Sequence, residues 1–287
     1  MGLHALGIGD GARPEIIRAV AIAAEAHGFA TLWAGEHVVL VDAPRSRYPY
    51  SPDGRIAVPA EADWLDPLLA LSFAAAVTSR IGLATGVLLL PLHNPVMLAK
   101  QAATLDVLSG GRFTLGIGIG WSAEEFTALG VPFARRGQRA AEYVAAMRAL
   151  WSDPVASFDG EFVHFDAVRV NPKPVRGRIP IVVGGNSDAA LSRAASFGHG
   201  WYGFNLPAAA VAERVGALAG QCAQQRRTIE GLTVAVALAD GGPDLLPALA
   251  ETGVTELVVV GAPPAAPDEA DRWVADLAAR WIARPPG

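Results

Sequence analysis

Short apolar runs alternate with longer helix-like segments along most of the chain. Residues 3–9, 29–35 and 81–90 are apolar runs bounded by glycine or polar residues, and they have the length of buried strands. The first intervening segment has the length of a helix, with Pro14 near its start and Gly28 at its end, where these residues are favoured. Continued along the chain, the pattern predicts about eight strand-then-helix units.

The later units follow the same pattern, with one interruption. Residues 155–178 are irregular and indicate an excursion from the repeat, with a hairpin turned at Asp159-Gly160. A polar, proline-rich stretch at 42–59 is typical of a long loop, which we expect to form a lid. Further strands are expected at residues 112–120, 179–185, 200–204, 232–238 and 254–261, and further helices at 63–80, 94–111, 122–129, 134–151, 187–197, 207–225, 243–252 and 267–284.

Strands that are apolar throughout, each followed by a helix, are typical of a closed parallel barrel with the helices outside. We therefore expect an α/β fold, a (β/α)8 TIM-type barrel formed as one domain over residues 1–287, with an irregular insertion between its fourth and fifth strands. A doubly wound parallel sheet is the alternative. The turn at Gly7–Gly11 is a poor match to the glycine fingerprint that such sheets use to bind dinucleotides.

The composition supports a large core and argues against several classes of function. Apolar residues make up 52% of the chain and charged residues 18%, which argues against disorder. The net charge of −5, with no basic run, gives no indication of nucleic-acid binding. No apolar run reaches the roughly 18 residues of a membrane span, and no signal-peptide pattern opens the chain. Cys222 is the only cysteine and the six histidines lack metal-ligand spacing, so we expect a cytoplasmic protein without a disulfide or a metal.

In a barrel of this kind, the active-site residues come from the carboxyl ends of the strands. Glu36 and His37 directly follow the second strand and so belong to this face. Strand alternation would turn His37 to the same side as Trp33 and Glu36 to the other, so we expect only His37 to face the pocket. A hydrogen-bonded histidine at the rim, with no chemical role, fits this position equally well.

Glycines gather at two other strand ends. Gly116, Gly118 and Gly120 alternate along the fourth strand and leave one of its faces without side chains. This bare face would admit a flat ligand; close packing inside the barrel is the alternative. The fifth strand ends in Gly184-Gly185-Asn186-Ser187 before a helix, where free backbone amides could bind a phosphate or form an ordinary capped turn.

Aromatic and acidic residues also lie near these strand ends. Trp201 and Tyr202 could wall an aromatic ligand or simply pack in the core. Glu124 and Glu125 fit the first turn of a helix, where carboxylates interact favourably with the helix dipole.

Four segments together resemble the bacterial luciferase-like monooxygenase superfamily. They are GEH at 35–37, LATGVLLLPLHNPVMLAKQAATLDVLSGGRFTLGIGIGW at 83–121, VNPKPVRGRIPIVVGGNS at 170–187 and GWYGF at 200–204. The resemblance extends from about residue 3 to 262, and the block at 83–121 is its most specific part. Within the superfamily, the chain is most similar to the branch of probable coenzyme F-420-dependent oxidoreductases.

The resemblance implies a luciferase-like TIM barrel with a flavin or deazaflavin at its C-terminal mouth. His37 would lie near the reactive face of the ring, and a non-prolyl cis peptide at Gly86-Val87 would lie behind the ring. The implied cofactor-binding residues are Thr85, Gly86, Val87, Gly118, Gly120, Gly184, Gly185, Asn186 and Ser187. Trp121, Trp201 and Tyr202 would shape the substrate pocket. Sugar-phosphate dehydrogenases of this superfamily carry a glutamate proton donor where this chain has Trp121, so their chemistry is not expected here.

The expected function is hydride transfer between coenzyme F-420 and a small organic substrate, with His37 as the acid–base group. An FMN-dependent monooxygenase that uses molecular oxygen is one alternative. A cofactor-binding or structural relative without turnover is another. The resemblance also implies a homodimer formed through helices beside the early strands.

Overall fold

The structure is a computed structural model that describes residues 1–282. The barrel strands are β1 (Gly2–Leu6), β2 (Thr31–Ala34), β3 (Gly82–Thr85), β5 (Phe113–Gly118), β8 (Ile181–Gly184), β9 (Gly200–Leu206), β10 (Thr233–Leu238) and β11 (Glu256–Val260), and β4 (Leu88–Leu89) is a short extension after β3. They pair in parallel in the order β3-β2-β1-β11-β10-β9-β8-β5, and the pairing of β3 with β5 closes the ring. The predicted (β/α)8 barrel is therefore confirmed.

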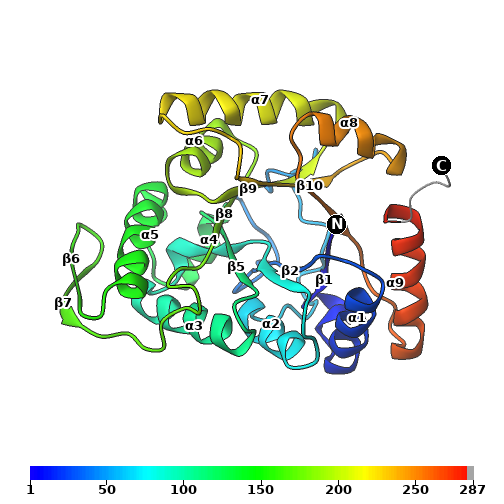
Figure 1. The fold of residues 1–287 in the computed structure, drawn as a ribbon, viewed down its shortest axis with the longest axis horizontal. Coiled ribbons are helices and arrows are strands. Elements are labelled where there is room, and N and C mark those ends of the chain that lie inside the picture. The colour runs from blue at the N-terminus through cyan, green and yellow to red at the C-terminus, as the bar shows by residue number, and fades with distance from the viewer. Residues whose placement is uncertain (283–287) are drawn as a thin grey trace.

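Helices surround this barrel (Figure 1). They are α1 (Pro14–Ala26), α2 (Pro67–Ala75), α3 (Pro95–Leu108), α4 (Ala123–Ala128), α5 (Arg136–Ser152), α6 (Asp188–Phe197), α7 (Ala208–Gln224), α8 (Leu246–Glu251) and α9 (Pro267–Trp281), with short 3-10 turns η1 (Gly9–Ala12), η2 (Leu90–Leu92) and η3 (Pro243–Leu245). The last helix was expected to run to residue 284, and positions 283 and 284 lie outside the described residues. Between residues 1 and 282, none of the helices is both long and apolar enough to cross a membrane.

The sequence fixes several helix starts by side-chain caps. Asp66, Asn94, Ser122 and Ser187 each precede a helix, and each accepts a hydrogen bond from a backbone N–H of its first turn. Proline occupies the first position of the helices that follow Asp66 and Asn94, where its missing N–H costs nothing. These caps set where the chain leaves the carboxyl ends of the strands, and so where the site residues lie.

The irregular insertion lies between the fourth and fifth barrel strands, β5 and β8. It contains the antiparallel hairpin β6 (Ala156–Asp159) and β7 (His164–Val168), which agrees with the turn predicted at Asp159-Gly160. The hairpin stands at the outside of the barrel next to α5 (Figure 1).

The apolar side chains form two clusters. The larger one lies mainly between the strands and the outer helices. The smaller one fills the inside of the barrel and includes Trp33, Ala84, Val182 and Tyr202. Trp33 and Tyr202 stack with their ring centroids 4.7 Å apart, so the interior below the barrel mouth is packed rather than hollow.

The second strand is shorter than expected. It ends at Ala34, so the alternation of side chains along the strand no longer applies at Glu36 and His37. Both of these residues line the cavity described below, so the prediction that only one of them would face the pocket is wrong.

Candidate functional site

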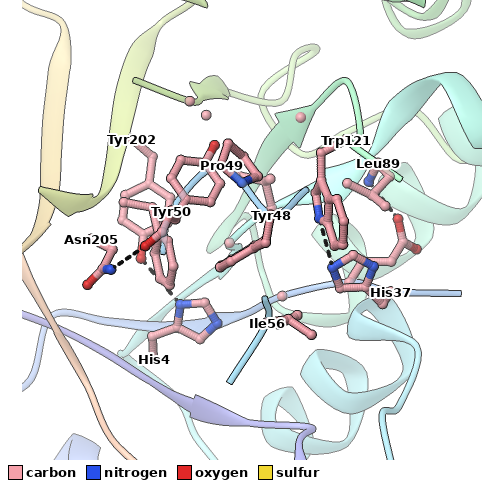
Figure 2. A pocket seen from close by; sticks show the side chains of 18 of the residues that line it. His4, His37, Tyr48, Pro49, Tyr50, Ile56, Leu89, Trp121, Tyr202 and Asn205 are labelled. Atoms are coloured by element: carbon pink, nitrogen blue, oxygen red, sulfur yellow. Dashed lines mark hydrogen bonds between the residues drawn. The ribbon is translucent and has the colours of Figure 1, made fainter. Parts of the chain in front are cut away.

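A cavity of about 890 Å³ opens at the carboxyl ends of the strands. Its walls come from the ends of β1, β2, β3, β5, β8, β9 and β11 and from the loop at 47–58. The position agrees with the rule that sites of this fold lie on the carboxyl face. Figure 2 shows His4 and His37 on opposite sides of the view, with Tyr48 and Ile56 between them.

His37 is held by two neighbours. Its Nδ1 lies 3.1 Å from Oε2 of Glu125, and the indole N–H of Trp121 points to its Nε2 at 3.4 Å (Figure 2). Because the indole can only donate, Nε2 must accept, and the proton of the neutral ring therefore sits on Nδ1 and is donated to Glu125. The ring thus presents a lone pair on Nε2 at the side of the cavity where Trp121 lies.

Glu125 is completely buried behind His37. Its other oxygen, Oε1, accepts a hydrogen bond from the backbone N–H of Val38 at 2.7 Å and a longer one from that of Val39 at 3.4 Å. A buried carboxylate needs such partners to offset its lost hydration. Glu125 therefore fixes both the position of His37 and the course of the chain that follows it.

Buried Glu36 forms a second pair beside the first, with the half-buried His93. Its side chain accepts hydrogen bonds from the backbone N–H of Leu89 at 2.6 Å and from Nε2 of His93 at 2.9 Å. Burial acts to lower the pKa of His93, but the hydrogen bond and negative charge of Glu36 outweigh it, so the pKa of His93 is raised above its usual value. This pair ties the end of β2 to the chain after β4.

The floor of the cavity is built around Val87. The Gly86-Val87 peptide bond is cis, as predicted from the resemblance. A Cβ added to Gly118 or to Gly184 would lie 2.7 Å from a methyl carbon of Val87, so both strand ends need glycine for this side chain to fit. Gly116 lies directly against the carbonyl oxygen of Thr85, so close packing explains that glycine. Gly118, in contrast, also lines the cavity.

The turn after β8 lies at one side of the cavity together with two arginines. All four of its residues, 184–187, line the cavity, as do Arg136 and Arg193. Nε of Arg193 is buried without a hydrogen-bond partner in the described residues. Burial, and next the positive charge of Arg136, lower the pKa of Arg193. Within residues 1–282 neither arginine has a carboxylate partner, and two such cations beside a helix start form a site that favours an anion.

The loop at 47–58 covers the cavity. Asn205 donates a hydrogen bond from Nδ2 to the carbonyl oxygen of Tyr50 at 2.7 Å (Figure 2). The backbone N–H groups of Arg45 and Ser46 donate to Oε1 of Glu124 at 2.7 and 3.1 Å. The ring of Tyr48 packs edge-on against Trp121 with centroids 5.3 Å apart. The loop thus covers an aromatic pocket, in the place where a lid was expected.

Most of the site residues implied by the resemblance meet in this cavity, and two, Thr85 and Trp201, do not. His37, Trp121, Tyr202, the Gly86-Val87 pair, Gly118, Gly120 and the turn at 184–187 all line it. Thr85 is buried beside it and donates from Oγ1 to the carbonyl oxygen of Gly116 at 2.6 Å. Trp201 packs in the outer core and supports the turn by donating from Nε1 to the carbonyl oxygen of Gly185 at 2.7 Å. The expectation that Trp201 walls the pocket is therefore wrong, because adjacent residues of a strand point to opposite faces.

Sequence reasoning missed several residues. Glu125 was assigned to the dipole of its helix, although the second of two adjacent carboxylates just after a strand end could have been paired with His37. The sequence around Arg136 and Arg193 gave no indication of a site, because Arg136 begins one helix, Arg193 lies within another, and only the fold brings them to the turn. His4, in the middle of the first strand, was missed as well.

Comparison with known proteins identifies the family to which this chain is similar. The family model of the luciferase-like monooxygenases matches residues 3–239. An uncharacterized protein of Mycobacterium tuberculosis is 40% identical over 265 residues, which cover 91% of this chain and 92% of that protein.

Two solved structures share the fold. One is the coenzyme F420-dependent tetrahydromethanopterin reductase of Methanopyrus kandleri, with a TM-score of 0.75, 17% identity and 98% of each chain covered. The other is the monooxygenase RslO1 of Streptomyces bottropensis, also with a TM-score of 0.75 and 98% of each chain covered, at 22% identity. At these identities the likeness concerns the fold alone. The family match and the barrel together show that this chain belongs to the luciferase-like monooxygenase family.

Proposed function

We propose that this chain is a coenzyme F-420-dependent oxidoreductase that transfers a hydride between the deazaflavin and a small organic substrate. The observation that carries the proposal is the charge of the cavity wall. Four arginines line it, at positions 47, 55, 136 and 193, and Glu36 is the one carboxylate among the described lining residues. Because Glu36 already pairs with His93, the wall presents a net positive charge to a ligand.

The described residues fit the phosphate that such a cofactor carries. Arg193 offers a buried Nε–H that lacks an acceptor. Arg136 holds its position by donating from Nε to the carbonyl oxygen of Gly120 at 3.1 Å and by stacking its guanidinium 3.8 Å from the ring centre of Phe133. Its remaining N–H groups stay available to an anion. The first turn of α6 adds free backbone amides after Ser187.

The charge beyond this turn favours F-420 over FMN. FMN carries one phosphate, whereas F-420 continues from its phosphate into a lactyl-glutamate tail with several carboxylates. Arg47 and Arg55 lie on the exposed loop over the cavity, where they could meet such a tail. A ligand with only one anionic group would leave these two arginines without an anionic partner.

When bound, the deazaflavin supplies a ring carbon that gives or accepts a hydride. The residues of this chain would hold the substrate and transfer its proton. His37 would accept a proton at Nε2 from a substrate hydroxyl, or return it in the reverse direction, while Glu125 stabilises the ring through Nδ1. Trp64 and Trp121 pack edge-on against His37, and Tyr48 packs against Trp121. Together these rings would exclude water from His37. Gly86-Val87 and the glycines around it would support the ring from below.

Titration of purified protein with F-420 and with FMN tests the proposal. We expect quenching of F-420 fluorescence with a micromolar or lower dissociation constant, and FMN binding at least tenfold weaker, which is about 1.4 kcal/mol. Replacing Arg193 by methionine should weaken F-420 binding by tenfold or more, while the same change at the exposed Arg169 should not. F-420 binding should also weaken with added salt, because charges at the cavity mouth are screened.

An FMN-dependent monooxygenase is the second candidate. The same turn and the same two arginines fit the phosphate of FMN, and the description of the matched family favours this chemistry. Stoichiometric FMN in the purified protein, with no binding of F-420, would replace the first proposal by this one.

A further inference from the structure

His4 and Tyr202 form a polar pair on the floor of the cavity, far along it from His37. Nδ1 of His4 lies 3.2 Å from the hydroxyl oxygen of Tyr202 (Figure 2). Both side chains line the cavity, yet His4 is only 7% and Tyr202 only 1% exposed. Buried polar groups in an otherwise apolar barrel interior need a reason, because each costs free energy unless it is hydrogen-bonded.

One ring nitrogen of this pair has no partner. Nε2 of His4 makes no hydrogen bond with any group of residues 1–282. An added Cβ on Gly35 would lie 3.3 Å from this nitrogen, and one on Gly86 would lie 3.3 Å from the adjacent Cε1, so glycines leave room beside the ring. The nitrogen therefore lies next to the peptide that we expect to support the cofactor ring.

The pair is uncharged at neutral pH. Burial holds the pKa of His4 at about 4 and raises the pKa of Tyr202 well above its usual value. The other contacts are aromatic: Trp33 stacks on Tyr202, and Phe204 lies 6.1 Å from His4 between ring centres. The carboxylate of Glu256 accepts a hydrogen bond from the indole N–H of Trp33 at 3.4 Å, and among residues 1–282 no hydrogen bond joins it to His4.

A neutral imidazole beside a hydroxyl can adapt to its ligand. If Nδ1 of His4 donates to the Tyr202 oxygen, Nε2 is an acceptor. If the Tyr202 hydroxyl donates to Nδ1, Nε2 carries the proton and is a donor. The pair can thus match a carbonyl oxygen, a hydroxyl or a ring N–H, but it offers no charge to bind an anion.

The position of the pair indicates which ligand group it meets. His4 is on β1, which pairs with β2, the strand that leads to His37, and Tyr202 is on β9, which pairs with β8, the strand that leads into the turn at 184–187. A ligand that reaches from this turn to His37 crosses the floor where the two side chains meet. We propose that His4 and Tyr202 bind an uncharged polar edge group of the cofactor's heterocyclic ring, through Nε2 of His4. This inference rests on the proposed function, because it takes a flavin-type ring as the ligand.

The test compares ligand binding by Tyr202→Phe with that by the wild type. Loss of the hydroxyl leaves Nδ1 of His4 without a partner, and we expect F-420 to bind about three- to tenfold more weakly, the range for one neutral hydrogen bond. Tyr143→Phe is the matched control, because Tyr143 is half-buried on α5 and does not line the cavity; its dissociation constant should equal that of the wild type. Thermal unfolding of both variants checks that they fold.

A second measurement needs no substitution. The ¹⁵N resonance of Nε2 of His4 in wild-type protein should move on addition of F-420, because a new hydrogen bond changes its electronic state. If F-420 fails to bind and FMN binds, the same comparisons are made with FMN. Binding of neither cofactor by the wild type would remove the proposed function and this inference with it. Cofactor binding that Tyr202→Phe leaves unchanged, with an unmoved Nε2 signal, would overturn this inference alone.

Discussion

Replacing Glu125 by glutamine tests how His37 is held. The substitution keeps the size of the side chain and one carbonyl oxygen, which can still accept from the backbone N–H of Val38. The new amide NH₂ must then face Nδ1 of His37, where it cannot accept the ring proton. The proton is forced to Nε2, where it meets the indole N–H of Trp121 at 3.4 Å.

The magnitude follows from these contacts. One hydrogen bond to a buried charged group is lost, which is worth about 1.5–3 kcal/mol. We expect the free energy of unfolding to fall by about 2 kcal/mol in urea denaturation. Because the lone pair of Nε2 is no longer available, turnover should fall by about 10²–10⁴ while the dissociation constant of the cofactor changes little.

The ¹⁵N spectrum of the His37 ring measures the tautomer directly. Wild-type protein should carry the proton on Nδ1, and Glu125→Gln should carry it on Nε2. Glu124→Gln is the neighbouring control, because Glu124 binds the lid rather than His37, so the tautomer should stay on Nδ1. A Glu125→Gln protein with the wild-type tautomer and wild-type turnover would refute the assignment.

Three further predictions follow from other parts of the structure. His37→Ala should lower turnover by about 10²–10⁴ and change cofactor affinity only a few-fold, since His37 acts on protons; unchanged turnover in steady-state kinetics would remove it from the mechanism. Burial raises the pKa of Glu25, but three backbone hydrogen bonds outweigh it and hold that pKa at about 2, so the stabilisation by Glu25 is present above about pH 4.5 and is lost as the pH falls through 2. Glu25→Gln should therefore cost about 1–2 kcal/mol at pH 7, after allowance for solvent screening, and much less at pH 2 in denaturant titrations. Finally, Leu69, Met97 and Leu108 are 60–71% exposed on α2 and α3, so we expect a homodimer through these helices; a monomeric mass in light scattering at micromolar concentration would contradict it.

The fold could be predicted because its pattern is local. Strand and helix lengths, the caps at Asn94 and Ser187 and the proline at position 95 are all readable in short windows, and the barrel follows from their alternation. The hairpin after Asp159 was equally readable. The end of β2 was not, because the chain leaves the sheet at Ala34 through contacts with distant residues.

Site residues could be predicted only where their position in the sequence pattern, such as the end of a strand, identifies them. His37 and the turn at 184–187 stand at strand ends, where the fold rule identifies them. Glu125, 88 positions away from His37, meets it only through the closure of the barrel. Arg193 has the same sequence context as any helical arginine, and its unpartnered Nε becomes visible only in three dimensions.

The short helix α4 contacts both the loop over the cavity and His37. Glu124 holds the lid at Arg45 and Ser46, and the next residue, Glu125, holds His37. Consecutive residues of one helical turn cannot move independently, so a lid that opens must either release Glu124 or drag Glu125 with it. If Glu125 moves with the lid, His37 loses its hydrogen-bond partner whenever the pocket is open to water. Opening of the lid for a ligand would then also change the position of His37, because the six residues of α4 couple the two movements.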